Sequence, residues 1–153
     1  MEAIIREATI ADMGEIIRFT AMIAEHEQSV FKAEAKTGQL QEYMFGDMPK
    51  IYCLLAVAND IVCGYATYSM EFSLFMADNY MRLNSLFVLP EYRGWGIGEQ
   101  LISKLFEVAR ANKCGGMQCF TPDFNIDAVD FYKRLGAKTR NSVRLYFDIE
   151  GVN

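Results

Sequence analysis

Apolar residues recur along this chain at two spacings, and the spacing predicts which segments are helices and which are strands. Between Met13 and Ala24 they return every three or four positions, which indicates one apolar face of a helix. Thr9 and Asp12 precede this stretch at the spacing of a capping box, in which a hydroxyl and a carboxylate bond the first backbone N–H groups. The same spacing predicts helices over residues 13–24, 38–45, 96–112 and 126–135, the last with Gly136 as its C-cap.

Other segments are apolar throughout or alternate between apolar and polar residues, which is typical of strands. Asn59 and Asp60 form a turn signal between two of them, so we expect an antiparallel hairpin there. The order of elements, β-α-α-β-β-β-α-β-α-β, predicts a mixed sheet with helices on both faces. The predicted strands cover residues 2–8, 51–58, 61–70, 80–88, 117–121 and 143–149, with 71–79 as loop or strand end.

Length, composition and charge narrow the classes of protein. The chain has 153 residues, of which 52% are hydrophobic, and this predicts one globular domain over residues 1–153. Its net charge of -5 argues against nucleic acid as a partner, because phosphate contacts need a basic surface. The same acidity favours a cationic substrate, although it is equally typical of any soluble acidic protein. We find no run near the ~20 apolar residues of a membrane span and no basic region leading into an apolar signal segment, so we expect no membrane contact and a cytoplasmic protein.

The cysteines and the histidine argue against a bound metal. The four cysteines stand at positions 53, 63, 114 and 119, and their spacings match no pair of zinc ligands. Cys53 and Cys63 lie inside apolar runs, so we expect buried free thiols. His26 is the one histidine of the chain, which excludes a histidine-rich metal site.

The stretch with most chemical information is Arg93–Gly98, Arg-Gly-Trp-Gly-Ile-Gly, between a predicted strand and a predicted helix. Its glycines permit a tight turn and the close approach of a ligand to the backbone. Such a turn directs free N–H groups at one point beside the positive end of a helix dipole, which suits an anion such as a diphosphate. Taken alone, the pattern is equally consistent with a strand-to-helix turn that binds nothing.

Other phosphate-binding loops fit these residues less well. A Walker loop ends in Gly-Lys-Ser/Thr, whereas Gly98 is followed by Glu99 and Gln100. A dinucleotide fingerprint counted from Gly94 needs a third glycine where Glu99 stands. A methyltransferase-type loop is the nearest rival, but it normally follows an acidic residue at the position of Arg93.

Arg93–Gly98 resembles the signature Arg/Gln-x-x-Gly-x-Gly/Ala of the GNAT superfamily of N-acetyltransferases. Residues 131–137, Phe-Tyr-Lys-Arg-Leu-Gly-Ala, resemble a later Phe-Tyr-x-x-x-Gly-Phe/Ala segment of that family. The similarity covers nearly the whole chain and is greatest to the spermidine/spermine and thialysine N-acetyltransferases. It implies the GNAT α/β fold, a mixed, mostly antiparallel sheet in which two neighbouring strands splay apart into a V.

The resemblance also implies acetyl-CoA as co-substrate. The pantetheine arm would pair with backbone at Leu86–Val88, and the diphosphate would lie on N–H groups of residues 93–98 where the helix begins. Asn125 matches a family asparagine that bonds the cofactor, and Tyr132 matches a tyrosine beside the CoA sulfur, which makes Tyr132 the expected catalytic acid. The residues implied in cofactor binding are Leu86, Phe87, Val88, Arg93, Gly94, Trp95, Gly96, Ile97, Gly98, Glu99 and Asn125.

The acceptor side departs from the polyamine enzymes. They have an acidic pair just before the cofactor segment, where this chain has Asn84 and Ser85, and a neutral pair neither attracts an alkylammonium by charge nor acts as a strong base. Glu27 matches a family acidic residue after the first helix, and Glu71 is a candidate for the acceptor mouth. Both are equally compatible with solvated carboxylates. His26 is a further candidate base because its pKa lies near neutrality, although a structural or exposed role is as consistent.

These residues predict an acetyl-CoA-dependent N-acetyltransferase that acts on a primary amine of a small polyamine or amino-acid-like molecule. A catalytically weak acyl-CoA-binding regulatory module and a protein or peptide N-terminal acetyltransferase stay open as alternatives. The resembling polyamine enzymes are dimers, and the apolar strand predicted at 143–149 suits pairing across a two-fold axis, so we expect a homodimer.

Overall fold

The computed structural model describes residues 2–31 and 36–150, which fall into a unit that ends at Pro122 and a unit that begins at Asp123. The first unit contains a sheet with helices packed on it, and the second contains one helix and an extended segment. The elements are β1 (Ile4–Glu7), α1 (Met13–His26), α2 (Thr37–Phe45), β2 (Tyr52–Ala58), β3 (Ile61–Ser73), β4 (Asp78–Val88), α3 (Ile97–Ala111), β5 (Cys114–Cys119) and α4 (Ile126–Arg134), with short 3-10 helices at Ile10–Asp12 and Pro90–Tyr92.

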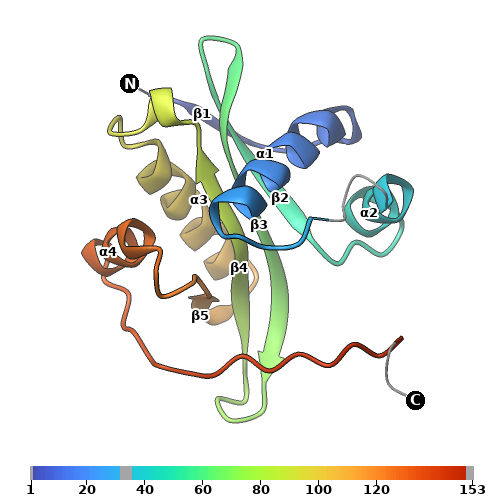
Figure 1. The fold of residues 1–153 in the computed structure, drawn as a ribbon, viewed down its shortest axis with the longest axis vertical. Coiled ribbons are helices and arrows are strands. Elements are labelled where there is room, and N and C mark those ends of the chain that lie inside the picture. Colours follow the sequence, from blue (N-terminus) through green and yellow to red (C-terminus); the bar gives the residue numbers. More distant parts are fainter. Residues whose placement is uncertain (1, 32–35, 151–153) are drawn as a thin grey trace. The chain divides into compact units, whose positions relative to one another are not determined.

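The sheet follows the order of the chain, β1-β2-β3-β4-β5 (Figure 1). Strands β1 to β4 are antiparallel, and β5 returns through α3 to pair parallel with β4. The long β3–β4 hairpin is in register from Gly64 opposite Val88 to Ser73 opposite Asp78. This mixed, mostly antiparallel sheet confirms the predicted fold class.

Helices α1 and α3 cover opposite faces of the sheet. The ring of Tyr65 on β3 stacks on Phe19 of α1, with centroids 5.3 Å apart. A Cβ at the preceding residue, Gly64, would lie 3.5 Å from the Leu101 side chain of α3. Successive strand residues point to opposite faces, so the prediction of helices on both faces is confirmed. The largest fully buried side chains come from the sheet and from the two helices that cover it, and they include Ile16, Phe19, Leu54, Leu55, Tyr65, Met81, Ile97, Leu101 and Leu105.

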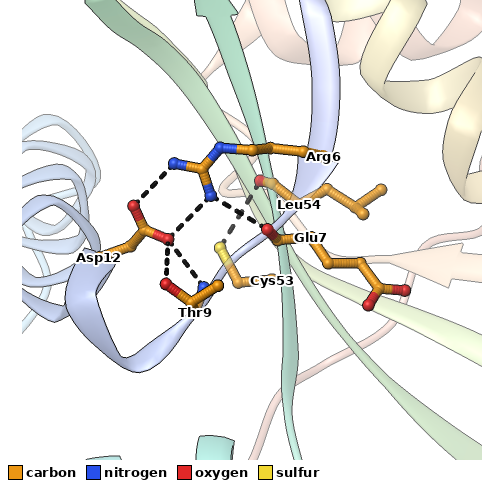
Figure 2. Close-up of polar contacts among 6 residues, drawn as sticks. All are labelled: Arg6, Glu7, Thr9, Asp12, Cys53 and Leu54. Carbon is orange, nitrogen blue, oxygen red and sulfur yellow. Dashed lines mark hydrogen bonds and ion pairs between the residues drawn. The ribbon is translucent and has the colours of Figure 1, made fainter.

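The corner between β1 and α1 is held by an ion pair and a capping box (Figure 2). Arg6 donates from Nη1 and Nη2 to the Asp12 carboxylate, each at 2.8 Å. The Thr9 backbone N–H donates to the same carboxylate at 2.7 Å, which confirms the capping box predicted from Thr9 and Asp12. The Arg6 guanidinium, aided by Thr9, holds the pKa of the Asp12 carboxyl well below its usual range. The pair thereby fixes the first strand to the first helix.

Two turns follow the sequence prediction. Asn59 and Asp60 have φ of 50° and 62°, and two positive φ values are the mark of a type I′ hairpin turn. Gly136, predicted as the C-cap of the last helix, has φ of 94°, and its N–H donates to the Lys133 carbonyl at 3.0 Å.

The beginning of β5 was predicted wrongly. The strand was expected over residues 117–121, but it begins at Cys114, directly after α3 ends near Asn112 as predicted and Lys113, with φ of 56°, turns the chain. Both glycines lie inside β5. A Cβ at Gly115 would lie 2.0 Å from the Asp78 carboxylate, so the glycine permits a close approach between β5 and the start of β4.

The predicted strand over residues 143–149 is not formed. Residues 137–148 have no regular secondary structure in the described chain. A strand exists only through hydrogen bonds to a neighbour, and no described strand pairs with this segment. Its apolar residues are therefore exposed: Val143, Leu145, Tyr146, Phe147 and Ile149.

The cysteines are free thiols, and those expected in the core are buried. Cys53 and Cys63 are both buried, as predicted. Burial raises the pKa of the Cys53 thiol to about 12, so it stays protonated and unreactive at neutral pH. Within residues 2–31 and 36–150, none of the helices has the length and apolar character needed to cross a membrane.

Candidate active site

Strands β4 and β5 separate before β4 ends. Their pairing runs from Asn79 opposite Cys114 to Leu83 opposite Cys119, whereas β3 stays paired with β4 up to Val88. In the described chain, Leu86–Val88 therefore has no strand partner on the β5 side. Backbone groups along that edge are free to bond an extended ligand. This separation is the V expected between two neighbouring strands.

The turn after β4 presents several free backbone donors. Gly94 and Gly96 have φ of 78° and 76°, values that favour glycine. The N–H of Arg93 donates to the Pro90 carbonyl at 3.2 Å. The first N–H that donates within the pattern of α3 is that of Gln100, to the Gly96 carbonyl at 3.0 Å. Between them, the N–H groups of residues 94–99 have no acceptor among the described residues. The free N–H groups therefore begin one residue later than the range 93–98 expected from the sequence.

Side chains around this turn leave space beside the donors. A Cβ at Gly94 would meet no atom within 4 Å, and one at Gly96 only the Glu99 carboxylate at 3.8 Å. Ile97 is buried and anchors the start of α3, whereas Trp95 is 53% exposed. Free N–H groups at a helix N-terminus next to open space form an anion site.

A bulge in β4 brings Asn84 and Ser85 to the same face of the sheet. Thr67 pairs with Ser85 and Tyr68 with Leu83, so Asn84 is the extra residue. The Asn84 amide donates to the Ser69 hydroxyl at 3.3 Å. Thr67 and Ser69 share one face of β3, the face that Tyr65 and α1 also occupy. The neutral pair predicted for the acceptor therefore lines the α1 face.

A buried tyrosine that the sequence analysis did not single out lies behind Ser85. Thr20 donates its hydroxyl hydrogen to the Ile16 carbonyl at 2.7 Å, so it accepts from the Tyr65 hydroxyl, 3.3 Å away. Ser85 lies diagonally across the hairpin from Tyr65, opposite Thr67, and forms part of the surroundings of the tyrosine hydroxyl. Burial raises the pKa of Tyr65, so its hydroxyl stays neutral. Ser85 itself is half-buried, so a ligand can reach its hydroxyl.

Glu27 lies just beyond α1 on the side that faces this network. It follows Thr20 by seven residues, about two helical turns, so both lie on the same side of the helix. The side chain is half-buried, and burial raises the pKa of its carboxyl. His26 is exposed. Of these two candidate bases, Glu27 has the environment that favours proton uptake.

Glu71 lies on the same face, further along the hairpin, and is engaged by neighbours. Arg82 donates to its carboxylate from Nε at 2.5 Å and from Nη2 at 3.0 Å, and Tyr80 donates its hydroxyl. The Arg82 guanidinium, with Tyr80, lowers the pKa of Glu71. Sequence reasoning missed Arg82 and Tyr80, because only the hairpin register places them beside Glu71. The structure does not bring Glu71 to Leu86–Val88, which lies toward the opposite end of β4.

The second unit contains Asn125 and Tyr132. The Asn125 side chain caps α4 by accepting from the Ala128 N–H at 3.3 Å. Tyr132 lies half-buried on α4, with its ring edge against Phe131, centroids 5.3 Å apart. Asn125 therefore has a structural task in its own helix in addition to any cofactor contact.

A cavity of about 390 Å³ lies elsewhere in the first unit. Its lining includes Tyr52, Tyr68 and Val108 and none of the residues predicted for the site. In the described part of the chain, no group of three or more His, Cys, Asp or Glu side chains lies together as metal ligands would.

Comparison with known proteins identifies the family. The family model "Acetyltransferase (GNAT) family" matches residues 17–137. The chain belongs to the GNAT acetyltransferases. This GNAT protein is 34% identical over 157 residues to the thialysine N-epsilon-acetyltransferase of Mus musculus, which covers 96% of the chain and 92% of that relative. It is also 28% identical over 140 residues to the spermidine/spermine N(1)-acetyltransferase-like protein 1 of Homo sapiens. That alignment covers 87% of this chain and 20% of the human protein.

A solved structure agrees on the fold. The GNAT protein superposes on an aminoglycoside N-acetyltransferase in complex with CoA with a TM-score of 0.79 and 18% identity, over 97% of this chain and 95% of the other. The family and the relatives together make the chain an N-acetyltransferase.

Proposed function

We propose that this GNAT acetyltransferase transfers the acetyl group of acetyl-CoA to the primary amine of a small molecule. The observation that carries the proposal is the unpaired edge at Leu86–Val88, followed along the chain by the free N–H groups of residues 94–99 in the turn before α3. The edge suits an extended amide-containing arm, and the donors suit a diphosphate. Relatives named for thialysine and for spermidine/spermine support a small amine as the acceptor.

The residues present fit acetyl-CoA. Leu86, Phe87 and Val88 would pair with the pantetheine arm, and the backbone of Gly94–Glu99 would hold the diphosphate. A backbone N–H of the same strand segment would stabilise the negative charge that develops on the thioester oxygen. Arg93 would hold the turn, and Asn125 is proposed to bond the cofactor as its family counterpart does.

The acceptor amine must lose a proton before it attacks, because a primary amine is mostly protonated at neutral pH. Ser85, half-buried on the α1 face opposite Thr67, would accept a hydrogen bond from the amine, with Asn84 beside it. Glu27, with its raised pKa, would take up the proton through water. Tyr132 would protonate the departing CoA thiolate, a role taken over from the matching family tyrosine.

The test is acetyl transfer from acetyl-CoA across a panel of spermidine, diamines, diamino acids and peptide N-termini, read as thiol release and product mass. We expect transfer to small amines, and calorimetry should detect CoA binding. Binding without transfer to any amine would contradict the proposal in favour of an acyl-CoA-binding module. Transfer confined to peptide N-termini would contradict it in favour of an N-terminal acetyltransferase.

We further infer that the whole chain acts as one catalytic domain, as a homodimer and in the cytoplasm. The match of the family model across the boundary between the two units supports one domain. Four free cysteines are typical of a reducing compartment. The exposed apolar segment 143–149 supports association with a second copy.

A further inference from the structure

A row of polar side chains follows the α1 face of the β3–β4 hairpin. On β3, alternate residues from Tyr65 to Glu71 share this face. Ser85 lies opposite Thr67, Arg82 opposite Ser69 and Tyr80 opposite Glu71. The row therefore begins at the neutral hydroxyl of Ser85, next to Leu86, and ends at an ion pair. A molecule extended along this row would meet hydroxyl groups first and charges second.

Arg82 is held rigidly and still has donors to offer. Its Nε and Nη2 are bonded to Glu71, Nη2 also donates to Tyr80 at 3.3 Å, and its guanidinium lies 4.9 Å over the ring of Phe120. No described residue accepts from Nη1. The Arg82 and Glu71 side chains are 28% and 36% exposed, so a ligand can reach them. A fixed guanidinium beside a carboxylate is complementary to the carboxylate and ammonium of an α-amino acid.

The spacing along the row matches such a molecule. Ser85 and Arg82 lie opposite residues two positions apart on β3, which is about 7 Å along an extended strand and six backbone bonds. Lysine has six bonds between its terminal amine nitrogen and its carboxylate carbon, and ornithine has five. A polyamine in the same place would bring a second cation toward Arg82, which like charges oppose.

We propose that Arg82, oriented by Glu71 and Tyr80, binds the carboxylate of an α-amino acid whose terminal amine is acetylated beside Ser85. The inference rests on the proposed acetyl transfer and specifies its substrate class. Ser85 receives the neutral amine, Arg82 selects the acid group, and Glu71 is placed to accept from the α-ammonium. The substitution of the polyamine enzymes' acidic pair by Asn84 and Ser85 then accompanies a shift of the charged recognition toward Arg82.

Matched acceptors test the proposal, because ornithine and putrescine, like lysine and cadaverine, differ by the carboxylate alone. We expect the wild-type protein to have a higher kcat/KM for each amino acid than for its diamine. In Arg82→Gln, the ratio of kcat/KM for ornithine over putrescine should fall about 10- to 100-fold, the range of one charge-assisted hydrogen bond, through the KM for ornithine. The ornithine-to-putrescine ratio of Arg82→Lys should lie between those of the wild type and Arg82→Gln, because lysine keeps the charge and loses the planar donors.

Arg18→Gln is the matched control. Arg18 is paired with Glu15 and lies 4.8 Å over the ring of Phe19, so this variant removes a comparable ion pair and ring contact from α1. Its ornithine-to-putrescine ratio should equal that of the wild type. An equal loss of kcat/KM for ornithine and putrescine in Arg82→Gln, or a wild-type preference for diamines, would overturn the proposal for Arg82 and leave the proposed acetyl transfer standing. Absence of transfer to any amine in the wild type would instead contradict the proposed function.

Discussion

The guanidinium of Arg93 joins the two parts of the proposed cofactor site. Its Nε donates to the Val88 carbonyl at 2.9 Å, and its charge lies 5.3 Å from the ring of Phe87. Val88 is the last residue of β4, and the free N–H groups begin directly after Arg93. One side chain thus fixes the turn proposed to bind the diphosphate to the strand edge that would hold the pantetheine arm. An exposed arginine in the signature therefore acts as a structural brace.

Tyr132 is the residue whose role is tested most directly by a single substitution. If its hydroxyl protonates the CoA thiolate, Tyr132→Phe should lower kcat about 10²-fold, the range typical of a general acid, while the Kd for CoA changes little. The measurement is steady-state turnover with a saturating amine, together with calorimetry of CoA binding. Tyr43→Phe on α2 is the control, and it should keep wild-type turnover. A Tyr132→Phe variant with unchanged kcat would remove Tyr132 from catalysis.

At the scale of elements, the corner between β1 and α1 should make stability depend on pH. The pKa of Asp12 is lowered in the folded protein by Arg6 and Thr9, so the carboxylate stabilises the fold above the ordinary Asp pKa of about 3.9. That contribution is lost as the pH falls toward the lower folded pKa. Asp12→Asn should therefore reduce the free energy of unfolding at pH 7, by about 1–2 kcal/mol for a lost cap and pair.

Urea denaturation between pH 3 and pH 7 measures this effect. The difference in free energy of unfolding between wild type and Asp12→Asn should become smaller below about pH 4, because protonation of Asp12 already weakens its pair with Arg6 in the wild type. Arg6→Gln should lower the free energy of unfolding in the same pH range. The double variant Arg6→Gln with Asp12→Asn should lose less free energy of unfolding than the two single variants together, since the two residues share one interaction. A gap that stays constant down to pH 3 would show that the Asp12 charge contributes nothing.

The elements that follow from local signals were predictable from the sequence. The capping box, the Asn59-Asp60 turn and Gly136 each depend on residues within a few positions, and all were confirmed. The glycine turn at 93–98 was predictable for the same reason. The positions of Tyr65 and Arg82 depend on the hairpin register and on the bulge at Asn84. The register joins Ser69 to Arg82 and Tyr65 to Phe87, 13 and 22 positions apart, so it leaves no local pattern in the sequence. Glycines that serve a close approach, as at Gly115, cannot be distinguished by sequence from glycines that end a helix.

At the scale of the whole molecule, the apolar segment 143–149 is the feature that bears on the proposed homodimer. Val143, Leu145, Phe147 and Ile149 alternate, so in a strand they would form one apolar face. Each is 73–85% exposed in the single chain, an unusual density of large apolar surface for a protein that stays monomeric. A second copy offers the same segment in return, which is the condition for a two-fold interface. The proposed homodimer would therefore cover a segment that forms no strand in the single chain.

Multi-angle light scattering tests this explanation. We expect the wild-type protein to have twice the 17.4 kDa mass of the chain at micromolar concentration. Leu145→Lys with Phe147→Lys places two charges on the apolar face, and since burying unpaired charges is costly, the variant should elute as a monomer. Phe75→Lys at the β3–β4 turn is the control, because Phe75 is equally apolar and fully exposed but lies outside the segment. A monomeric wild type, or a double-lysine variant that still has the dimer mass, would contradict pairing through residues 143–149.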